Sequence, residues 1–406
     1  LKLSLNDLEG IADLEKASEI DPELPIAKLA LASAYIRNKD YDKALELAEK
    51  WKETDPDKVE GYNLKAKILL ITNDLEKAES ELNLALGINE FNAYSLLYFS
   101  TKALTEKKYK ESIRLIDMLI SNYPNHLAGL RLQYKSYKEI GNTNIALSRI
   151  EKSYMDNQDN SEYITLYTKV LFIEKQYNKV IELLSDFDNK ELSLAIHWVL
   201  LGDSYMSIGE DEKALDIFTR WLSVQPQYRV AWLRKVSLQE KLKDYTNALS
   251  TTNSALKLSP EDLDFKLLRA HFLILTRDFI QAQVQLNSLT DIEQQLPLAK
   301  GLQAKIWLTE GKFKKAVSGL ESLYEQMPNS YNAALLFATL KKVEQDEYAF
   351  NFIKRHVEKF PDDYTISNLL AESAVNLDIN LAKKVYTKLL KRSPDDLSIL
   401  NNLAWV

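Results

Sequence analysis

Histidine and cysteine are the side chains that most often bind transition metals or act as nucleophiles and bases near neutral pH. The 406-residue sequence contains no cysteine, which excludes disulfides, thiolate metal sites and a cysteine nucleophile. Its four histidines lie far apart in the sequence, so they form no short-range metal motif. They are His126, His197, His271 and His356. We interpret all four as structural histidines whose polar atoms find partners within the fold.

Other catalytic patterns are also missing from the sequence. There is no phosphate-binding Gly-rich loop, no Gly-x-Gly-x-x-Gly and no His-Glu-x-x-His. Carboxylates such as Asp55, Glu210 and Asp362 lie in polar turns or on the expected outer faces of helices, where charged groups are usually solvated. The sequence therefore predicts a protein that is not an enzyme, with no catalytic residues, no cofactor and no metal site.

Composition limits the remaining function classes. The net charge of −7 argues against binding to nucleic acid, because phosphate backbones need a basic surface. No apolar run approaches the ~18–20 residues that span a membrane, so we expect no membrane contact by this chain itself. Only ten glycines and ten prolines are present, and 46% of the residues are hydrophobic. This composition predicts a folded protein that is nearly all helix.

A regular step of about 34 residues runs through the sequence. An alanine recurs at this step in nine of eleven positions, and Ser112 and Val180 occupy the other two. Most prolines recur at the same step. After Pro328 the step becomes one residue shorter. The alanines are Ala44, Ala78, Ala146, Ala214, Ala248, Ala282, Ala316, Ala349 and Ala382, and the prolines are Pro22, Pro56, Pro124, Pro226, Pro260, Pro328, Pro361 and Pro394. Self-similarity at such a period is typical of solenoids built from repeated units.

Each unit has the pattern of two amphipathic helices joined by a polar turn and ended by the proline. Small residues recur ten positions after the proline, as at Gly202 and Ala338, and we expect them to let the two helices approach closely. The predicted organisation is one solenoid over residues 1–406. It has a partial repeat at 1–21, eleven repeats of about 33–34 residues at 22–393, and the start of another at 394–406.

The segment Trp198-Val199-Leu200-Leu201-Gly202-Asp203-Ser204-Tyr205, followed by Ala214, Phe218 and Pro226, resembles the signature of the tetratricopeptide repeat (TPR). The resemblance implies an all-α fold, a TPR α-solenoid in which antiparallel helix pairs wind into a right-handed superhelix. In this family the first helix of each pair lines a concave inner groove. The resemblance also implies a protein or peptide ligand in that groove.

Groove-facing side chains in a TPR occupy the fourth, seventh, eleventh, fourteenth and fifteenth positions after the proline position. This register selects a set of basic and apolar residues that we name as the candidate partner-binding groove. They are Asn63, Lys67, Leu70, Tyr94, Leu97, Leu104, Arg131, Lys135, Lys169 and Phe172. In a chain of negative net charge, this cluster of cations would suit an acidic or extended peptide, or an anionic glycan. The alternative interpretation is that these are ordinary solvated positions.

The sequence lacks the residue patterns of two specialised kinds of TPR. The clamp for a C-terminal carboxylate uses a lysine with an asparagine four residues later, whereas this sequence has Asn63 before Lys67. An asparagine ladder, as in sugar-transferase TPRs, would need more asparagines than Asn63, Asn332, Asn368 and Asn376. Neither specialised ligand is therefore expected.

Segments such as Tyr41–Glu49, Phe218–Leu222 and Leu400–Trp405 resemble the bacterial PEP-CTERM system TPR-repeat lipoproteins. That resemblance implies a protein scaffold of the bacterial cell envelope or periplasm, linked to exopolysaccharide and protein-sorting systems. Because the sequence begins at Leu1 and ends within an apolar segment, we expect it to be part of a longer protein with any lipid anchor upstream. Two alternatives remain: a cytoplasmic TPR adaptor or co-chaperone, and the regulatory TPR arm of an enzyme.

Overall fold

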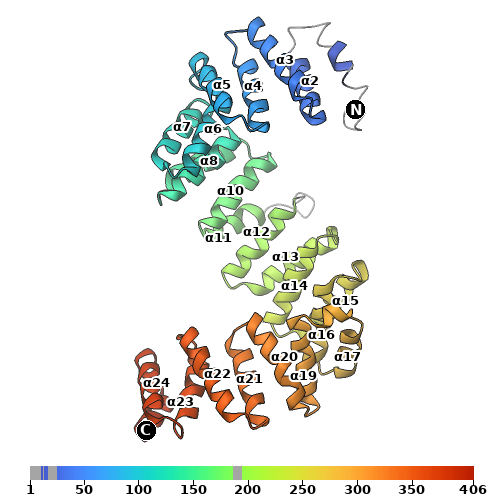
Figure 1. Cartoon of the computed structure of the whole chain (residues 1–406), viewed down its shortest axis with the longest axis vertical. Coiled ribbons are helices and arrows are strands. Elements are labelled where there is room, and N and C mark those ends of the chain that lie inside the picture. The colour runs from blue at the N-terminus through green and yellow to red at the C-terminus, as the bar shows by residue number, and fades with distance from the viewer. Residues whose placement is uncertain (1–10, 12, 17–24, 186–193) are drawn as a thin grey trace. The chain divides into compact units, whose positions relative to one another are not determined.

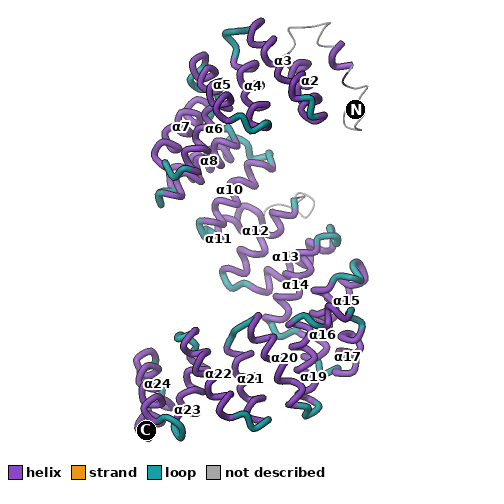
Figure 2. The backbone as a smooth tube through the Cα atoms, in the orientation of Figure 1, coloured by secondary structure: helices purple, strands orange, loops and turns teal. Residues whose placement is uncertain are grey.

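The structure is a computed structural model that describes residues 11, 13–16, 25–185 and 194–406. Most of the predicted partial repeat at 1–21 lies outside the described residues. Throughout the described ranges the regular secondary structure is helical (Figures 1 and 2), and no helix there is both long and apolar enough to cross a membrane. The chain forms two compact units, Leu1–Leu183 and Leu184–Val406, which we describe separately.

The described helices follow one another in pairs, each made of a first and a second helix joined by a tight turn. The first helices are α2 (Pro25–Asn38), α4 (Val59–Ile71), α6 (Ala93–Thr105), α8 (Leu127–Glu139), α10 (Ser161–Ile173), α12 (Ala195–Ser207), α14 (Arg229–Lys241), α16 (Leu263–Leu275), α19 (Pro297–Thr309), α21 (Ser330–Lys342) and α23 (Tyr364–Ala374). In most of these pairs the two helices pack closely against one another, as α4 does against α5 and α19 against α20.

The second helices complete these pairs. They are α3 (Tyr41–Thr54), α5 (Leu75–Ile88), α7 (Tyr109–Asn122), α9 (Asn144–Met155), α11 (Tyr177–Ser185), α13 (Asp211–Val224), α15 (Tyr245–Leu258), α17 (Phe279–Asn287), α20 (Phe313–Gln326), α22 (Asp346–Lys359) and α24 (Ile379–Arg392). Of the helices from α2 onward whose bounds the structure describes, two lie outside the pairs: the short α18 (Asp291–Gln294) and the final α25 (Leu397–Trp405). The predicted all-α fold of packed helix pairs is therefore confirmed.

The turn inside a pair has one recurring backbone feature. In ten pairs a single turn residue has a left-handed φ between 58° and 83°, and these residues follow the step of the alanines. They are Lys39, Asn73, Lys107, Gly141, Lys175, Gly209, Lys243, Arg277, Gly311 and Glu344. The next residue then donates its N–H to a carbonyl five positions back, as Asp244 does to Gln239 at 2.8 Å. This is the Schellman arrangement, which satisfies carbonyls at a helix C-terminus.

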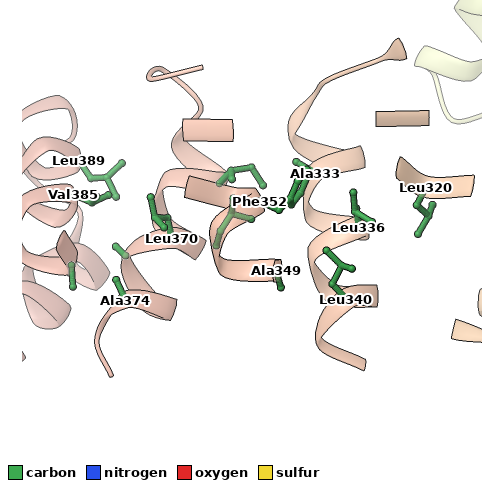
Figure 3. Close-up of a cluster of buried hydrophobic side chains, with 14 of the residues drawn as sticks. Leu320, Ala333, Leu336, Leu340, Ala349, Phe352, Leu370, Ala374, Val385 and Leu389 are labelled. Carbon is green, nitrogen blue, oxygen red and sulfur yellow. The ribbon is translucent and has the colours of Figure 1, made fainter. Parts of the chain in front are cut away.

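The core runs through the helix pairs of each unit. Every residue of the alanine series, including Ser112 and Val180, is completely buried. In the second unit, Leu320, Leu336, Phe352 and Leu370 come from four different helices and form part of one continuous buried cluster (Figure 3). Each helix therefore buries its apolar face against its neighbours along the chain, as a solenoid requires.

The small residues of the first helices have different surroundings. A Cβ atom added at Gly202 would overlap the ring of Phe218, so this glycine allows the expected close approach of the two helices. Ala338 is exposed and lies away from any helix crossing. The reason is register: α21 begins two residues after Pro328, whereas first helices such as α14 begin three residues after their proline.

Candidate functional site

The predicted groove residues lie in the first unit, on the four first helices α4, α6, α8 and α10. Helix α8 contacts both α6 and α10, which brings their residues onto neighbouring helices. Helix α4 packs against α5, which in turn packs against α6. All four predicted cations, Lys67, Arg131, Lys135 and Lys169, are exposed, and none of the ion pairs between described residues includes them.

The other predicted residues of this face are partly occupied by packing within the fold. The amides of Asn63 and Asn92 exchange two hydrogen bonds, of 3.1 and 2.7 Å, between α4 and the start of α6. Leu97 and Leu104 pack against the buried cluster around Leu96 and Leu115. The Asn63 amide and these leucines thus stabilise the helix pairs, and the exposed cations remain the groups most accessible to a partner.

The remaining aromatic and apolar candidates are half-buried. The ring of Phe172 meets that of Tyr177 edge to face, with centroids 5.3 Å apart. Burial raises the pKa of the Tyr94 hydroxyl, and Leu70 is also only partly exposed. Side chains of this kind can contribute apolar contact area to a partner that is held by the neighbouring cations.

The second unit contains a cavity of about 620 Å³ that the sequence-based candidates did not include. Its walls come mainly from the first helices α14, α16 and α19, and its rim continues onto α20 and the start of α21. Both its volume and its lining, which combines seven leucines with a few polar and charged groups, are typical of pockets that hold a ligand. The first helices of the second unit therefore form a concave apolar site.

The cavity follows the register that was applied to the first unit. The same five positions, counted from Pro226, Pro260 and Gln294, supply much of the lining. These residues are Leu233, Glu240, Asp264, Leu267, His271, Leu275, Leu298 and Lys305. Applying the same register beyond Phe172 would have assigned these residues to the groove from the sequence.

One hydrogen-bonded pair crosses the cavity wall between α14 and α16. Nε2 of His271 lies 2.8 Å from Oε1 of Glu240, and this hydrogen bond lowers the pKa of the Glu240 carboxyl. The His271 ring also meets the ring of Phe272 edge to face, with centroids 5.1 Å apart. His271 therefore has a partner within the fold, although its side chain still lines the cavity.

Lys305 is the charged residue of the cavity lining whose charge is least balanced by nearby groups of opposite charge. Burial lowers the pKa of its ammonium group, and the negative charge of Glu240 opposes this effect. Its Nζ lies 5.3 Å from the centroid of the Tyr331 ring, a distance at which the ring attracts a cation. None of the ion pairs between described residues includes Lys305. A cation that is partly buried in an apolar cavity is thus left to interact with an aromatic face.

Two other histidines also have structural partners. Nδ1 of His126 accepts the backbone N–H of Gly129 at 3.1 Å, at the start of α8. His356 is buried, with Nδ1 2.7 Å from the Tyr324 hydroxyl and Nε2 2.8 Å from Oδ2 of Asp363. Over the described parts of the chain, no group of three or more potential metal ligands comes together. The geometry at these histidines therefore stabilises neighbouring helices.

Comparison with known proteins finds solved structures of similar fold and family profiles of one repeat. No curated protein sequence matches the chain. Solved structures similar to it include the Cut9–Hcn1 hetero-tetramer of APC/C, with 15% identity over 97% of this chain and 92% of that chain and a TM-score of 0.43. Yeast Tom70 has 13% identity over 97% and 90%, with a TM-score of 0.47. Naa15/Naa10 bound to HypK-THB has 12% identity over 96% and 62%, with a TM-score of 0.42.

Family profiles for the tetratricopeptide repeat match three parts of the sequence. One profile matches residues 9–68 and 240–306, a second matches 198–229, and a third matches 59–92. The matched parts include α16 and most of α19, which form part of the cavity wall. These matches identify tetratricopeptide repeats in the matched parts of the chain, where the structure has repeated helix pairs.

Proposed function

We propose that the chain is a non-catalytic scaffold that binds a segment of a partner protein along its first helices. The observation that carries this proposal is the cavity of the second unit, which is lined by leucines at regular positions of successive first helices. Leu275 and Met327 stand at this cavity with 37% and 45% of their surfaces exposed, so apolar surface is available for a partner.

A photo-crosslinking amino acid placed at Leu275 tests this proposal. The partner should crosslink from Leu275 in cell extract, where the side chain lines the cavity. The matched control is Ile280 on the second helix α17, which is 77% exposed and does not line the cavity. Equal crosslinking from Ile280 and Leu275 would contradict binding along the first helices.

A second contact surface for an acidic partner, on the first unit, is part of the same proposal. It consists of the exposed cations Lys67, Arg131, Lys135 and Lys169, supported by their lack of ion pairs with described residues. Changing all four to serine should leave the helix content unchanged and weaken the binding of an acidic partner. If that partner binds the fourfold variant with unchanged affinity, the surface lies elsewhere.

We also propose a place for the scaffold in the bacterial cell envelope, as a TPR lipoprotein of a PEP-CTERM and exopolysaccharide system. The support is the likeness of segments such as Tyr41–Glu49 and Leu400–Trp405 to that family. Fractionation of cells that produce the native protein tests the location. Recovery with the envelope would support the lipoprotein, whereas recovery in the cytosol would favour an adaptor or the regulatory arm of an enzyme.

A further inference from the structure

We infer that the cavity of the second unit binds a partner segment that carries a leucine-like side chain next to an aspartate or glutamate, whose side-chain carboxylate pairs with Lys305. This inference rests on the proposed scaffold function and specifies the chemistry of the partner at one site.

The apolar part of the inference follows from the cavity lining. Leu267 and Leu302 form buried parts of the wall, each with 7% of its surface exposed, and Leu268 lies beside them. Leu275 and Met327 are more exposed parts of the same lining. A space of about 620 Å³ with this lining gains most from an aliphatic side chain, because burial of apolar surface is the main favourable contribution to such binding.

The acidic part follows from the charges that line the cavity. Glu240 is paired with His271, and Asp264 is paired with Arg229 outside the lining. Lys305 is the lining charge that has no ion pair with any described residue. A partly buried cation with no carboxylate of the described residues at ion-pair distance is costly, and a carboxylate brought by the partner would reduce that cost.

The position of Lys305 favours a side chain over a chain terminus as the source of the carboxylate. Lys305 lies on α19, and the lining continues on one side to His271 of α16 and on the other to Tyr331 of α21. A segment whose carboxylate reaches Lys305 can therefore continue in both directions. A single lysine also suits a carboxylate better than a phosphate group, which proteins usually bind with arginine clusters.

The first experiment selects ligands without assuming a partner. Random twelve-residue peptides, displayed with both ends fused inside a carrier protein, are selected on the full chain. We expect the selected sequences to combine Leu, Ile or Met with a neighbouring Asp or Glu. A synthetic copy, acetylated and amidated at its ends, should bind about tenfold more weakly when its acidic residue is changed to the amide, as expected for loss of a hydrogen-bonded charge.

Variants of the chain then locate the contact. Lys305→Met should weaken the acidic peptide about tenfold and should leave the amide-containing peptide unaffected, because both changes remove the same ion pair. Lys314→Met is the matched control, since Lys314 is an exposed lysine of α20 outside the lining. Leu275→Gln should weaken both peptides. The thermal midpoint of Lys305→Met should equal or exceed that of the unmodified protein.

Four results would overturn the inference, and they differ in what they say about the scaffold. Peptides that bind Lys305→Met and Leu275→Gln with unchanged affinity would place the site elsewhere and leave the scaffold function intact. The same conclusion would follow if binding were lost only in the fourfold variant of Lys67, Arg131, Lys135 and Lys169. Selected peptides whose amide-containing copies bind the unmodified chain with unchanged affinity would contradict a role for the side-chain carboxylate. Failure to select any peptide would count against both the site and the proposed function.

Discussion

Gly202 of α12 lies directly against the ring of Phe218 of α13, so that a Cβ atom on Gly202 would come within 2.8 Å of three ring carbons. Phe218 has no room to withdraw, because it is completely buried and packs against Trp221 with ring centroids 6.4 Å apart. We therefore expect Gly202→Ala to destabilise the second unit by ~1–3 kcal/mol, the usual cost of overpacking a core. Urea unfolding followed by circular dichroism measures this change.

The control for Gly202→Ala is the same substitution at Gly87. Gly87 lies near the end of α5, and a Cβ atom added there would meet nothing within 4 Å. Because alanine is the better helix former, Gly87→Ala should stabilise the first unit by ~0.5–1 kcal/mol. Similar effects of the two substitutions would show that the close contact with Phe218 does not matter.

A second prediction concerns the left-handed turn residues. Lys243 has φ of 60° in the turn between α14 and α15, and this conformation costs a side-chain-bearing residue ~1–2 kcal/mol. Lys243→Gly should therefore raise the free energy of unfolding, by about 1 kcal/mol after the larger entropy loss of glycine. Lys384→Gly, at an exposed position inside α24, should lower it by a similar amount. Thermal unfolding of both variants distinguishes these signs, and destabilisation by Lys243→Gly would contradict the turn geometry.

These turns show where the sequence is informative about the fold. The regular step of the alanines predicts the helix pairs and the complete burial of residues such as Ala44 and Ala214. It does not reveal the left-handed backbone, because Lys, Asn, Arg or Glu occupies seven of the ten positions and only three carry glycine. The helix register after Pro328 also escapes prediction, since the proline pattern alone cannot show that α21 begins one residue early.

For the candidate site, the position of a residue within the repeat predicts which side chains line the cavity better than the amino-acid types alone do. It places Lys305 and His271 at equivalent positions of neighbouring first helices, and both line the cavity. It cannot show that His271 turns toward Glu240, or that Lys305 lies against Tyr331, because these contacts depend on side-chain conformations in different repeats. The cavity volume also depends on how α16, α19 and α21 pack, which no local pattern encodes.

A third prediction concerns a buried carboxylate in the first unit. The Glu81 side chain is 9% exposed and lies 2.8 Å from Nζ of both Lys52 and Lys65, while Lys65 also contacts Glu49 at 2.7 Å. Glu81→Gln would leave these lysines with too little negative charge, so we expect a loss of ~1–3 kcal/mol, somewhat below the cost of breaking a fully buried pair. Urea unfolding measures the loss.

The matched control for Glu81→Gln is Glu111→Gln. Glu111 and Arg114 form an ion pair in which both side chains are about half exposed, at 48% and 57%. Its loss should cost less than ~0.5 kcal/mol, as is usual at surfaces. Equal losses in the two variants would indicate that burial around Glu81 adds nothing to its pairing with the lysines.

A fourth prediction concerns alkaline pH and the tyrosines that hold carboxylates of the preceding second helix. The Tyr98 hydroxyl donates to Glu79 at 3.0 Å, and burial together with this hydrogen bond raises the pKa of Tyr98 to about 12. Tyr137 donates to Asp117 at 2.9 Å, and burial and the same type of hydrogen bond raise its pKa as well. Both hydroxyls belong to first helices and hold the carboxylates in place only while they are protonated.

The sign of the pH effect follows from these raised values. Because the folded-state pKa of Tyr98 exceeds the value of about 10 in an unfolded chain, its contribution to stability is complete below pH ~10 and is lost as the pH rises through 12. We therefore expect the urea midpoint to fall over this range, together with the rise in phenolate absorbance. Tyr98→Phe should cost about 1 kcal/mol at pH 7 and should reduce the alkaline loss. The control is Tyr123→Phe, at a position with 41% of its surface exposed, which should change neither the stability at pH 7 nor the alkaline loss of stability. If Tyr98→Phe and the unmodified protein lose the same stability at alkaline pH, ionisation of Tyr98 is not the cause of that loss.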